Sequence, residues 1–180
     1  LRQNPEKLKG QGQIQTYMEL TAPIDHNKKE FKYQGSDPSI TIQVVEAKVP
    51  GTSKDFIKNE LLAPMGINNY GWQEDTSGLP KSAAGSSWRS RDMLKMGILI
   101  LDKGKWQGKQ HIPAEFVELA TSSIDTNPNR GYGYFWWTHQ AKVGNKTYIC
   151  KSGRGAGGQF ILMFPEIDLI IVSTAHNKGM

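Results

Sequence analysis

The chain has 180 residues, which suits one domain or two small subdomains, and no apolar stretch approaches the roughly 20 residues that a membrane span needs. The formal net charge is +5, but the lysines are scattered and form no stripe with aromatic residues, which argues against a nucleic-acid-binding protein. A single cysteine excludes an internal disulfide, and the four histidines lack metal-ligand spacing, so we expect neither a metal nor another cofactor.

The first half of the chain carries start and stop signals for helices. Apolar residues recur at near-helical spacing ahead of Pro23, which ends the first helix. Ser36 precedes Pro38 in the pattern of a capped helix start, and this signal outweighs the β-branched residues that follow. Thr52, with Asp55 three residues later, resembles a capping box. The predicted helices are Gln11–Leu20, Asp37–Ala47 and a third from Thr52 to about Leu62.

The second half of the chain changes from helices to strands. Residues 66–87 are rich in glycine and are expected to form loops. Ser90 is expected to cap a helix that ends at Gly104, and Pro113 to begin a shorter one. From Gly131 onward, aromatic and apolar runs alternate with turns, which favours an antiparallel meander of three or four strands.

Helices followed by strands predict an α+β arrangement or a piece of an α/β sandwich. A sheet this apolar needs covering on both faces, and the helices present would cover one of them. We expect residues 1–89 to form part of a helical subdomain with connecting loops. Residues 90–180 are expected to supply helices and antiparallel strands of an α/β subdomain. We interpret the chain as a fragment of one larger domain.

The segment Lys151-Ser152-Gly153, followed by a glycine-rich bend and an apolar strand, carries the strongest chemical signal. Such a strand is typical of serine acyl-transfer enzymes, in which the lysine lies beside backbone that binds a carboxylate or an oxyanion. These enzymes take their nucleophile from a Ser-x-x-Lys turn, yet no serine here has lysine three residues later. We therefore interpret the chain as the later part of an active site whose attacking serine lies upstream of Leu1.

Six segments carry a family pattern over nearly the whole chain: Phe31–Gly35, Asp55–Ile67, Ser90–Gly97, Gly104–Pro113, Gly131–Tyr134 and Gly157–Leu169. In this order they resemble the serine beta-lactamase and penicillin-binding-protein-like hydrolase family, in its class C and esterase-like branch. The resemblance implies a beta-lactamase/transpeptidase-like fold, of which this chain is the C-terminal part, and it favours a periplasmic or secreted location. The chain departs from the family in lacking the Ser-x-x-Lys element and a closing helix after Met180. Gly35 also stands where the family has an asparagine.

The resemblance implies roles for a small set of residues. Tyr33 would relay a proton between the serine and the leaving group. Lys151 would bind a substrate carboxylate and favour the ionised tyrosine, Ser152 would hydrogen-bond the same carboxylate, and Gly153 would allow close backbone approach. Lys151, Ser152 and Gly153 would lie at the edge of the sheet, lining a cleft. An alternative register places Arg154 in the motif, facing the substrate, and leaves Lys151 as an ordinary strand residue.

Structural explanations compete with each of these roles. Tyr33 could be a half-buried aromatic residue ahead of a helix, and Lys151 a surface lysine before a bend. The aromatic block Tyr132–Trp137 is explained by core packing, with a wall of the acyl pocket as the alternative.

Three functions follow. The first is the C-terminal portion of a serine hydrolase acting by acyl-enzyme chemistry on an amide, lactam or ester, of beta-lactamase, D,D-peptidase or esterase type. Its substrate would be a small molecule or peptidoglycan-like, and this fragment alone would be inactive without the missing N-terminal part. The second is a catalytically inactive binding or scaffold protein on the same fold, which Gly35 favours. The third, a nucleic-acid-binding module, is supported by net charge alone.

Overall fold

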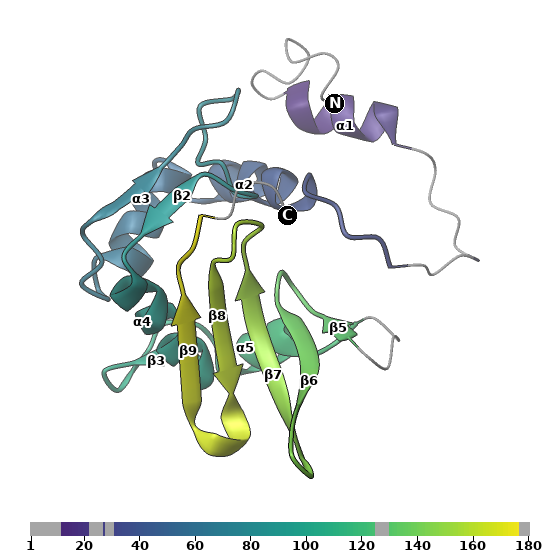
Figure 1. Ribbon diagram of the computed structural model, residues 1–180. Coiled ribbons are helices and arrows are strands. Elements are labelled where there is room, and N and C mark those ends of the chain that lie inside the picture. Colours follow the sequence, from purple (N-terminus) through teal and green to yellow (C-terminus); the bar gives the residue numbers. More distant parts are fainter. Residues whose placement is uncertain (1–11, 22–26, 28–30, 125–129, 177–180) are drawn as a thin grey trace. The chain divides into compact units, whose positions relative to one another are not determined.

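The computed structural model describes residues 12–21, 27, 31–124 and 130–176. The chain divides into two compact units, Leu1–Ser87 and Trp88–Met180. In the described part of the chain, the five α-helices precede the five strands of the long antiparallel sheet, and this sheet belongs to the second unit (Figure 1). Among the described residues, no helix is both long enough and apolar enough to cross a membrane.

The first unit is mainly helical. The three predicted helices are present, and the third continues as a π-helical turn that ends at Leu62 as expected. Most of the glycine-rich segment is irregular as expected, with two short paired strands near its ends that the sequence analysis did not predict. The elements are α1 (Gly12–Leu20), α2 (Asp37–Lys48), α3 (Ser53–Ile57), η2 (Lys58–Leu62), β1 (Tyr70–Trp72) and β2 (Ser86–Trp88), which ends at the unit boundary.

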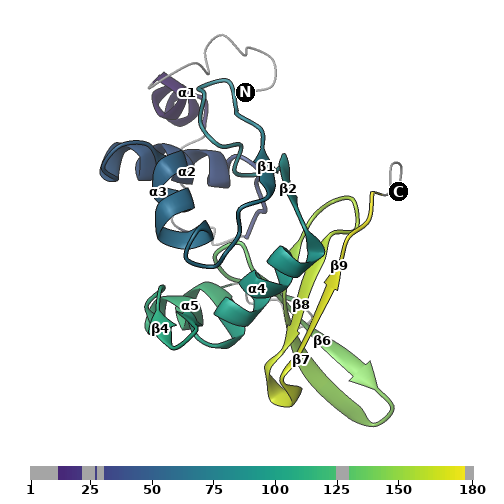
Figure 2. The same ribbon diagram turned by 90° about the vertical axis from the view of Figure 1, so that its left-hand side faces the viewer.

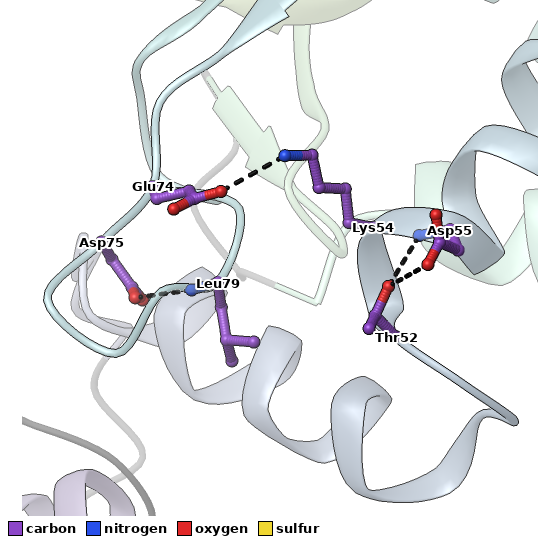
Figure 3. Close-up of polar contacts among 6 residues, drawn as sticks. All are labelled: Thr52, Lys54, Asp55, Glu74, Asp75 and Leu79. Atoms are coloured by element: carbon purple, nitrogen blue, oxygen red, sulfur yellow. Dashed lines mark hydrogen bonds and ion pairs between the residues drawn. The ribbon is translucent and has the colours of Figure 1, made fainter.

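The starts of α2 and α3 differ in mechanism. The hydroxyl of Thr52 accepts a hydrogen bond from the backbone N–H of Asp55 at 3.1 Å and donates one to the carboxylate of that residue at 2.8 Å (Figure 3). This confirms Thr52 as the capping residue, although the Asp55 carboxylate binds the Thr52 hydroxyl and not its backbone N–H as in a full capping box. Ser36 makes no side-chain cap, and its hydroxyl lies 3.4 Å from that of Tyr17. Ser36 is therefore the N-cap residue as predicted, but its side chain does not cap the helix, and Pro38 in the first turn favours the helical φ angle.

The loop between β1 and β2 is organised by Asp75. One carboxylate oxygen accepts hydrogen bonds from the N–H of Ser77 at 2.8 Å, from its hydroxyl at 2.6 Å and from the N–H of Leu79 at 3.1 Å. Lys54 of α3 forms a 3.2 Å ion pair with Glu74 at the same loop (Figure 3). Because that pair is solvent-exposed, it contributes little, and the Asp75 turn fixes the loop.

The second unit is built on a five-stranded antiparallel sheet in the order β5-β6-β7-β8-β9. The predicted meander is confirmed, although it has five strands because the short strands on either side of the aromatic block also pair. A two-stranded β3-β4 hairpin joins the two helices. The elements are α4 (Ser90–Leu101), β3 (Lys105–Trp106), β4 (Lys109–Gln110), α5 (Ala114–Thr121), β5 (Arg130–Tyr132), β6 (Trp137–Val143), β7 (Lys146–Arg154), β8 (Phe160–Phe164), η3 (Pro165–Ile167) and β9 (Leu169–Ser173).

The ends of α4 are set by backbone geometry. Its N-cap is Arg89, and Ser90 is the first helical residue, with its hydroxyl 3.4 Å from that of Thr174 on the strand side. The prediction that Ser90 caps the helix is therefore wrong by one residue. Gly104 has a φ of 83°, and its N–H donates to the carbonyl of Leu99 at 2.7 Å. This left-handed turn confirms the predicted stop.

Both helices of this unit lie on one face of the sheet (Figure 2). At Gly97 of α4, a Cβ atom would lie 2.9 Å from Cγ2 of Ile170 and 3.0 Å from Cγ2 of Ile161, so the absence of a side chain permits close packing. The side chain of Lys151 reaches α5 from the same face. We call this the helix face. Its interior includes the buried side chains of Leu99, Val117, Ala120 and Met163.

The opposite face, called here the open face, carries the strand residues that alternate with those of the helix face. On β9 these include Leu169 and Ile171, whose side chains are 40% and 44% exposed. The helices of this unit therefore cover one face of an apolar sheet, as the sequence predicts.

Candidate functional site

Lys151 and Ser152 lie inside the sheet and not at its edge. Lys151 pairs with Thr138 of β6 and with Met163 of β8, and Ser152 likewise has a partner on each side. The prediction that these two residues line the sheet edge is therefore wrong. The reason is the hairpin partner β6, which sequence analysis did not identify as a strand because His139 interrupts its alternation of apolar and polar residues.

The edge of the sheet begins one residue later. β6 pairs with β7 only as far as Ser152, whereas β8 continues alongside Gly153 and Arg154. The N–H of Gly155 donates to the carbonyl of Gln159 at 2.8 Å, on the β8 side. Because backbone groups alternate in direction along an antiparallel strand, the N–H of Arg154 points away from β8, toward the side where β6 has ended. This amide is positioned to bind a carboxylate or an oxyanion.

The ammonium group of Lys151 lies between the sheet and α5. It donates a hydrogen bond of 2.8 Å to the hydroxyl oxygen of Thr121, and that hydroxyl donates to the carbonyl of Val117 at 2.9 Å. Burial lowers the pKa of Lys151 below its ordinary value of 10.5, while nearby Glu118 opposes the shift and Lys103 adds to it. Lys151 is thus a half-buried cation with a fixed acceptor, and not a surface lysine.

Arg154 lies on the open face, because it is three positions beyond Lys151 on the strand and side chains alternate between the two faces. Its Nε donates to the hydroxyl of Ser152 at 2.9 Å, and its Nη2 lies 2.7 Å from Nδ1 of His139. The guanidinium carbon lies 5.6 Å from the ring centroid of Trp137. These four residues are called here the arginine cluster.

The cluster leaves His139 as an acceptor. An arginine side chain has donors only, so Nδ1 of His139 accepts the hydrogen bond and carries no proton. Burial lowers the pKa of His139 below its ordinary value of 6.5, and the charge of Arg154 adds to this effect. The ring is therefore kept neutral beside a cation.

The two residues proposed for the charged position of the motif, Lys151 and Arg154, thus lie on opposite faces of the sheet. Lys151 points to the helix face and Arg154 to the open face, while Ser152 is fully buried beneath the guanidinium. Gly153 lies between them, at the start of the open edge. A Cβ atom at Gly153 would lie 3.5 Å from Cζ3 of Trp136, an ordinary van der Waals contact.

Tyr33 belongs to the first unit, in the extended segment that leads into α2. Its side chain is 58% exposed, so it is not a core residue of that unit. A Cβ at Gly35 would have no atom within 4 Å, which leaves the position of the family's asparagine open. That Tyr33 and the β7 residues share one site stays a prediction.

The aromatic block divides between core and surface. Tyr132 is 8% exposed and packs edge-on against Trp137, with ring centroids 4.7 Å apart, which confirms core packing for this residue. Tyr134 lies 6.3 Å from Phe116 and is partly exposed.

Sequence reasoning missed His139 and Thr121. Counting back from the Gly144-Asn145 turn places His139 opposite Cys150 and Trp137 opposite Ser152, so the hairpin register contained the signal for His139. Thr121 lies thirty residues from Lys151, and only the packing of α5 on the sheet brings the two together.

A metal site and an apolar groove are two further kinds of possible site. Among the described residues, no three His, Cys, Asp or Glu side chains gather as metal ligands do. A groove of about 580 Å³ runs between α4 and β9, lined partly by Leu94, Ile98 and Leu169. It is separated from β7 by β8, and it contains none of the predicted site residues.

Comparisons with known proteins identify the family of this chain and solved structures with a similar fold. The family model for beta-lactamase matches residues 6–179. No curated protein sequence matches the chain. A solved structure from Bacillus anthracis, described as a 6-aminohexanoate-dimer hydrolase, has a TM-score of 0.72 at 20% identity and covers 87% of this chain and 40% of its own. A solved structure from Bacteroides dorei, described as a beta-lactamase, has a TM-score of 0.73 at 15% identity. The match covers 92% of this chain and 55% of that structure's chain.

A class C beta-lactamase has a TM-score of 0.69 at 15% identity, over 98% of this chain and 60% of its own length. At these identities the likeness concerns the fold alone. The chain spans about half the length of the structures that it resembles.

Proposed function

This chain belongs to the beta-lactamase family, and we propose that it carries part of the active site of a serine hydrolase that works through an acyl-enzyme intermediate. The family and the mixed α/β fold are those that the six sequence segments indicated. The proposed substrate is an amide, a lactam or an ester, in a small molecule or a peptidoglycan-like polymer. The nucleophile is a serine of a Ser-x-x-Lys turn outside these 180 residues, none of whose serines has that spacing.

The observation that carries the proposal is the open edge of β7 at Arg154. Attack of a serine oxygen on a carbonyl carbon places negative charge on the carbonyl oxygen. A backbone N–H held in fixed geometry stabilises that charge without reorganising. The N–H of Arg154 meets this requirement, since β8 holds the strand in place and β6 does not cover the amide. Gly153 and Gly155 on either side let a substrate approach the backbone closely.

Proton transfers complete the reaction. Tyr33 relays the hydroxyl proton of the attacking serine, which it receives directly or by way of the lysine of the Ser-x-x-Lys turn. The tetrahedral intermediate then collapses, the bond to the leaving group breaks, and Tyr33 delivers a proton to that group. Water attacks the resulting acyl-serine by the same route and restores the free serine.

The charged group that binds the substrate is proposed in two alternatives. In the first, Lys151 binds a substrate carboxylate, with Gly153 giving access, while Ser152, fully buried on the opposite face, makes no contact with the substrate. In the second, Arg154 takes that role from the open face. The KM for a carboxylate-bearing substrate separates them, because only the residue in contact should raise KM when it is replaced.

The direct test uses the whole protein that contains this chain. We expect one serine, located in a Ser-x-x-Lys sequence, to be phosphonylated by a fluorophosphonate with loss of fluoride, or acylated by a penicillin with opening of its lactam ring. Ser152→Ala should keep full labelling, because the hydroxyl of Ser152 is buried and holds Arg154. An intact Ser-x-x-Lys serine that resists every probe would refute the proposal.

A second function is supported by Gly35. Replacement of the family's asparagine removes an amide that would bind the substrate, as expected for an inactive binding or scaffold protein. Absence of a serine at the expected turn of the whole protein would decide for this alternative.

A further inference from the structure

The arginine cluster leaves the charge of Arg154 uncompensated. Its guanidinium has five N–H donors, of which Nε–H is used by Ser152 and one on Nη2 by His139. Both acceptors are neutral groups. Within the part of the chain that the structure describes, no carboxylate lies within ion-pairing distance of this guanidinium. The remaining donors therefore belong to a cation without an anion.

The same contacts fix the guanidinium in place. Ser152 is fully buried on the central strand of the sheet, so the acceptor at Nε does not move. The ring of Trp137 lies at cation–π distance, and His139 holds the second nitrogen. An arginine that is already ordered loses less conformational entropy when it binds a planar anion.

His139 is the contact that makes this arrangement suited to an anion. An aspartate at this position would hold the guanidinium equally well but would neutralise its charge. A neutral imidazole accepts a hydrogen bond and leaves the positive charge available. The groups facing His139 are Cys150 and Arg154 on β7, and Arg130 is its partner in the β5 register. Among the described side chains, neither of the two on β7 is acidic, so neither favours the imidazolium form.

We infer that His139 is a positioning residue that fixes the Arg154 guanidinium as a binding group for a carboxylate of the substrate. This inference rests on the proposed hydrolase function for the identity of the ligand, although the site itself is defined by the cluster alone. The carboxylate would accept two parallel hydrogen bonds from the free guanidinium N–H groups. Loss of the His139 acceptor would free the arginine side chain and weaken that contact.

The test compares two probes in the whole protein by calorimetric titration. N-benzoylglycine carries a carboxylate, and N-benzoylglycinamide has the same shape without the charge. We expect the acid to bind at least about tenfold more tightly than the amide, since a hydrogen bond to a charged group contributes about 1.5–3 kcal/mol, with 1.4 kcal/mol per factor of ten. Arg154→Met should abolish this preference.

Variants of His139 separate positioning from general stability. Asparagine offers an acceptor oxygen near the place of Nδ1, so His139→Asn should keep the preference for the acid. His139→Leu removes the acceptor and should lower the preference about tenfold or to none. Unchanged thermal melting of both variants serves as the folding control. Equal binding of acid and amide by the wild-type protein, no binding of either, or a full preference in His139→Leu would overturn the inference.

The fluorophosphonate probe bears no carboxylate and keeps the two proposals apart. Phosphonylation of the wild-type protein without a preference for the acid would refute the role of His139 alone. A preference for the acid in a protein that is not phosphonylated would refute the hydrolase function alone.

Discussion

The ammonium group of Lys151 on β7 lies 2.8 Å from the hydroxyl oxygen of Thr121 at the end of α5. This contact joins the central strand to a helix on its covered face, and the hydroxyl is oriented for it because it donates to Val117. The nearest counter-charge acts only at longer range, through Glu118. Thr121 therefore provides the main polar contact of a half-buried cation.

Replacement of Thr121 should reveal the energy of this contact. Thr121→Val keeps the side-chain shape but leaves the ammonium without its acceptor, so we expect the free energy of unfolding to fall by about 1–3 kcal/mol. Thr121→Ser keeps the hydroxyl and should cost less than the valine variant. Urea denaturation of the whole protein measures both. A loss in Thr121→Ser as large as that in Thr121→Val would contradict the assignment, because the serine variant keeps the hydroxyl.

The pKa of His139 gives a pH-dependent prediction. Burial and, second, Arg154 lower this pKa below 6.5 in the folded state. Between the lowered pKa and 6.5 the unfolded chain binds more protons, so the contribution of His139 to stability rises with pH there and is constant above 6.5. As pH falls through this window the contribution is lost, together with the acceptor for Arg154.

NMR titration of the His139 ring checks this directly. We expect a pKa below 6.5 in the wild-type protein and a higher value in Arg154→Met, still below 6.5 because burial is the larger cause. In His139→Asn the difference in unfolding free energy between pH 5 and pH 7 should be smaller than in the wild type. A His139 pKa at or above 6.5 would contradict the neutral acceptor.

The packing of α4 on the sheet depends on the missing side chain of Gly97. A Cβ there would stand 2.9 Å from Cγ2 of Ile170 and 3.0 Å from Cγ2 of Ile161. Those methyl groups belong to β-branched side chains that have little freedom to move. Gly97→Ala should therefore destabilise the protein by about 1–3 kcal/mol, even though alanine favours a helix by about 1 kcal/mol.

Gly35→Ala is the matched control, because a Cβ at Gly35 meets no atom within 4 Å. It should leave the melting temperature nearly unchanged. A gain in stability from Gly97→Ala would mean that α4 does not lie as close to β8 and β9 as the structure has it.

Replacement of Tyr33 tests the proposed proton relay. Tyr33→Phe should slow acylation of the whole protein by about 10²–10⁴-fold, the usual contribution of a positioned acid or base. Its exposed position predicts little change in thermal stability. Tyr134→Phe, at a tyrosine that is 42% exposed, is the control and should acylate at the normal rate. Equal rates in both variants would remove Tyr33 from the mechanism.

The sequence predicted those elements whose signals are local. The cap at Thr52, the stop at Gly104 and the proline start of α2 each depend on residues within one turn, and each helix is present. At α2 the start signal outweighed the β-branched residues, as expected when tertiary packing and caps decide a helix.

The elements that were missed depend on partners far along the chain. β6 reads Trp-Thr-His-Gln-Ala-Lys-Val, an alternation of apolar and polar residues that His139 interrupts and that sequence analysis did not recognise, and it pairs with β7 over its whole length. That pairing moved Lys151 from the expected edge to the centre of the sheet and brought His139 to Arg154. The family resemblance supplied the candidate residues, but only strand register determines which face each one occupies.

The most direct test of the central claim is mass spectrometry of the whole protein after reaction with a fluorophosphonate. We predict one modified residue, the serine of a Ser-x-x-Lys sequence outside these 180 residues. Modification of Ser152, or of any other serine within them, would contradict the account.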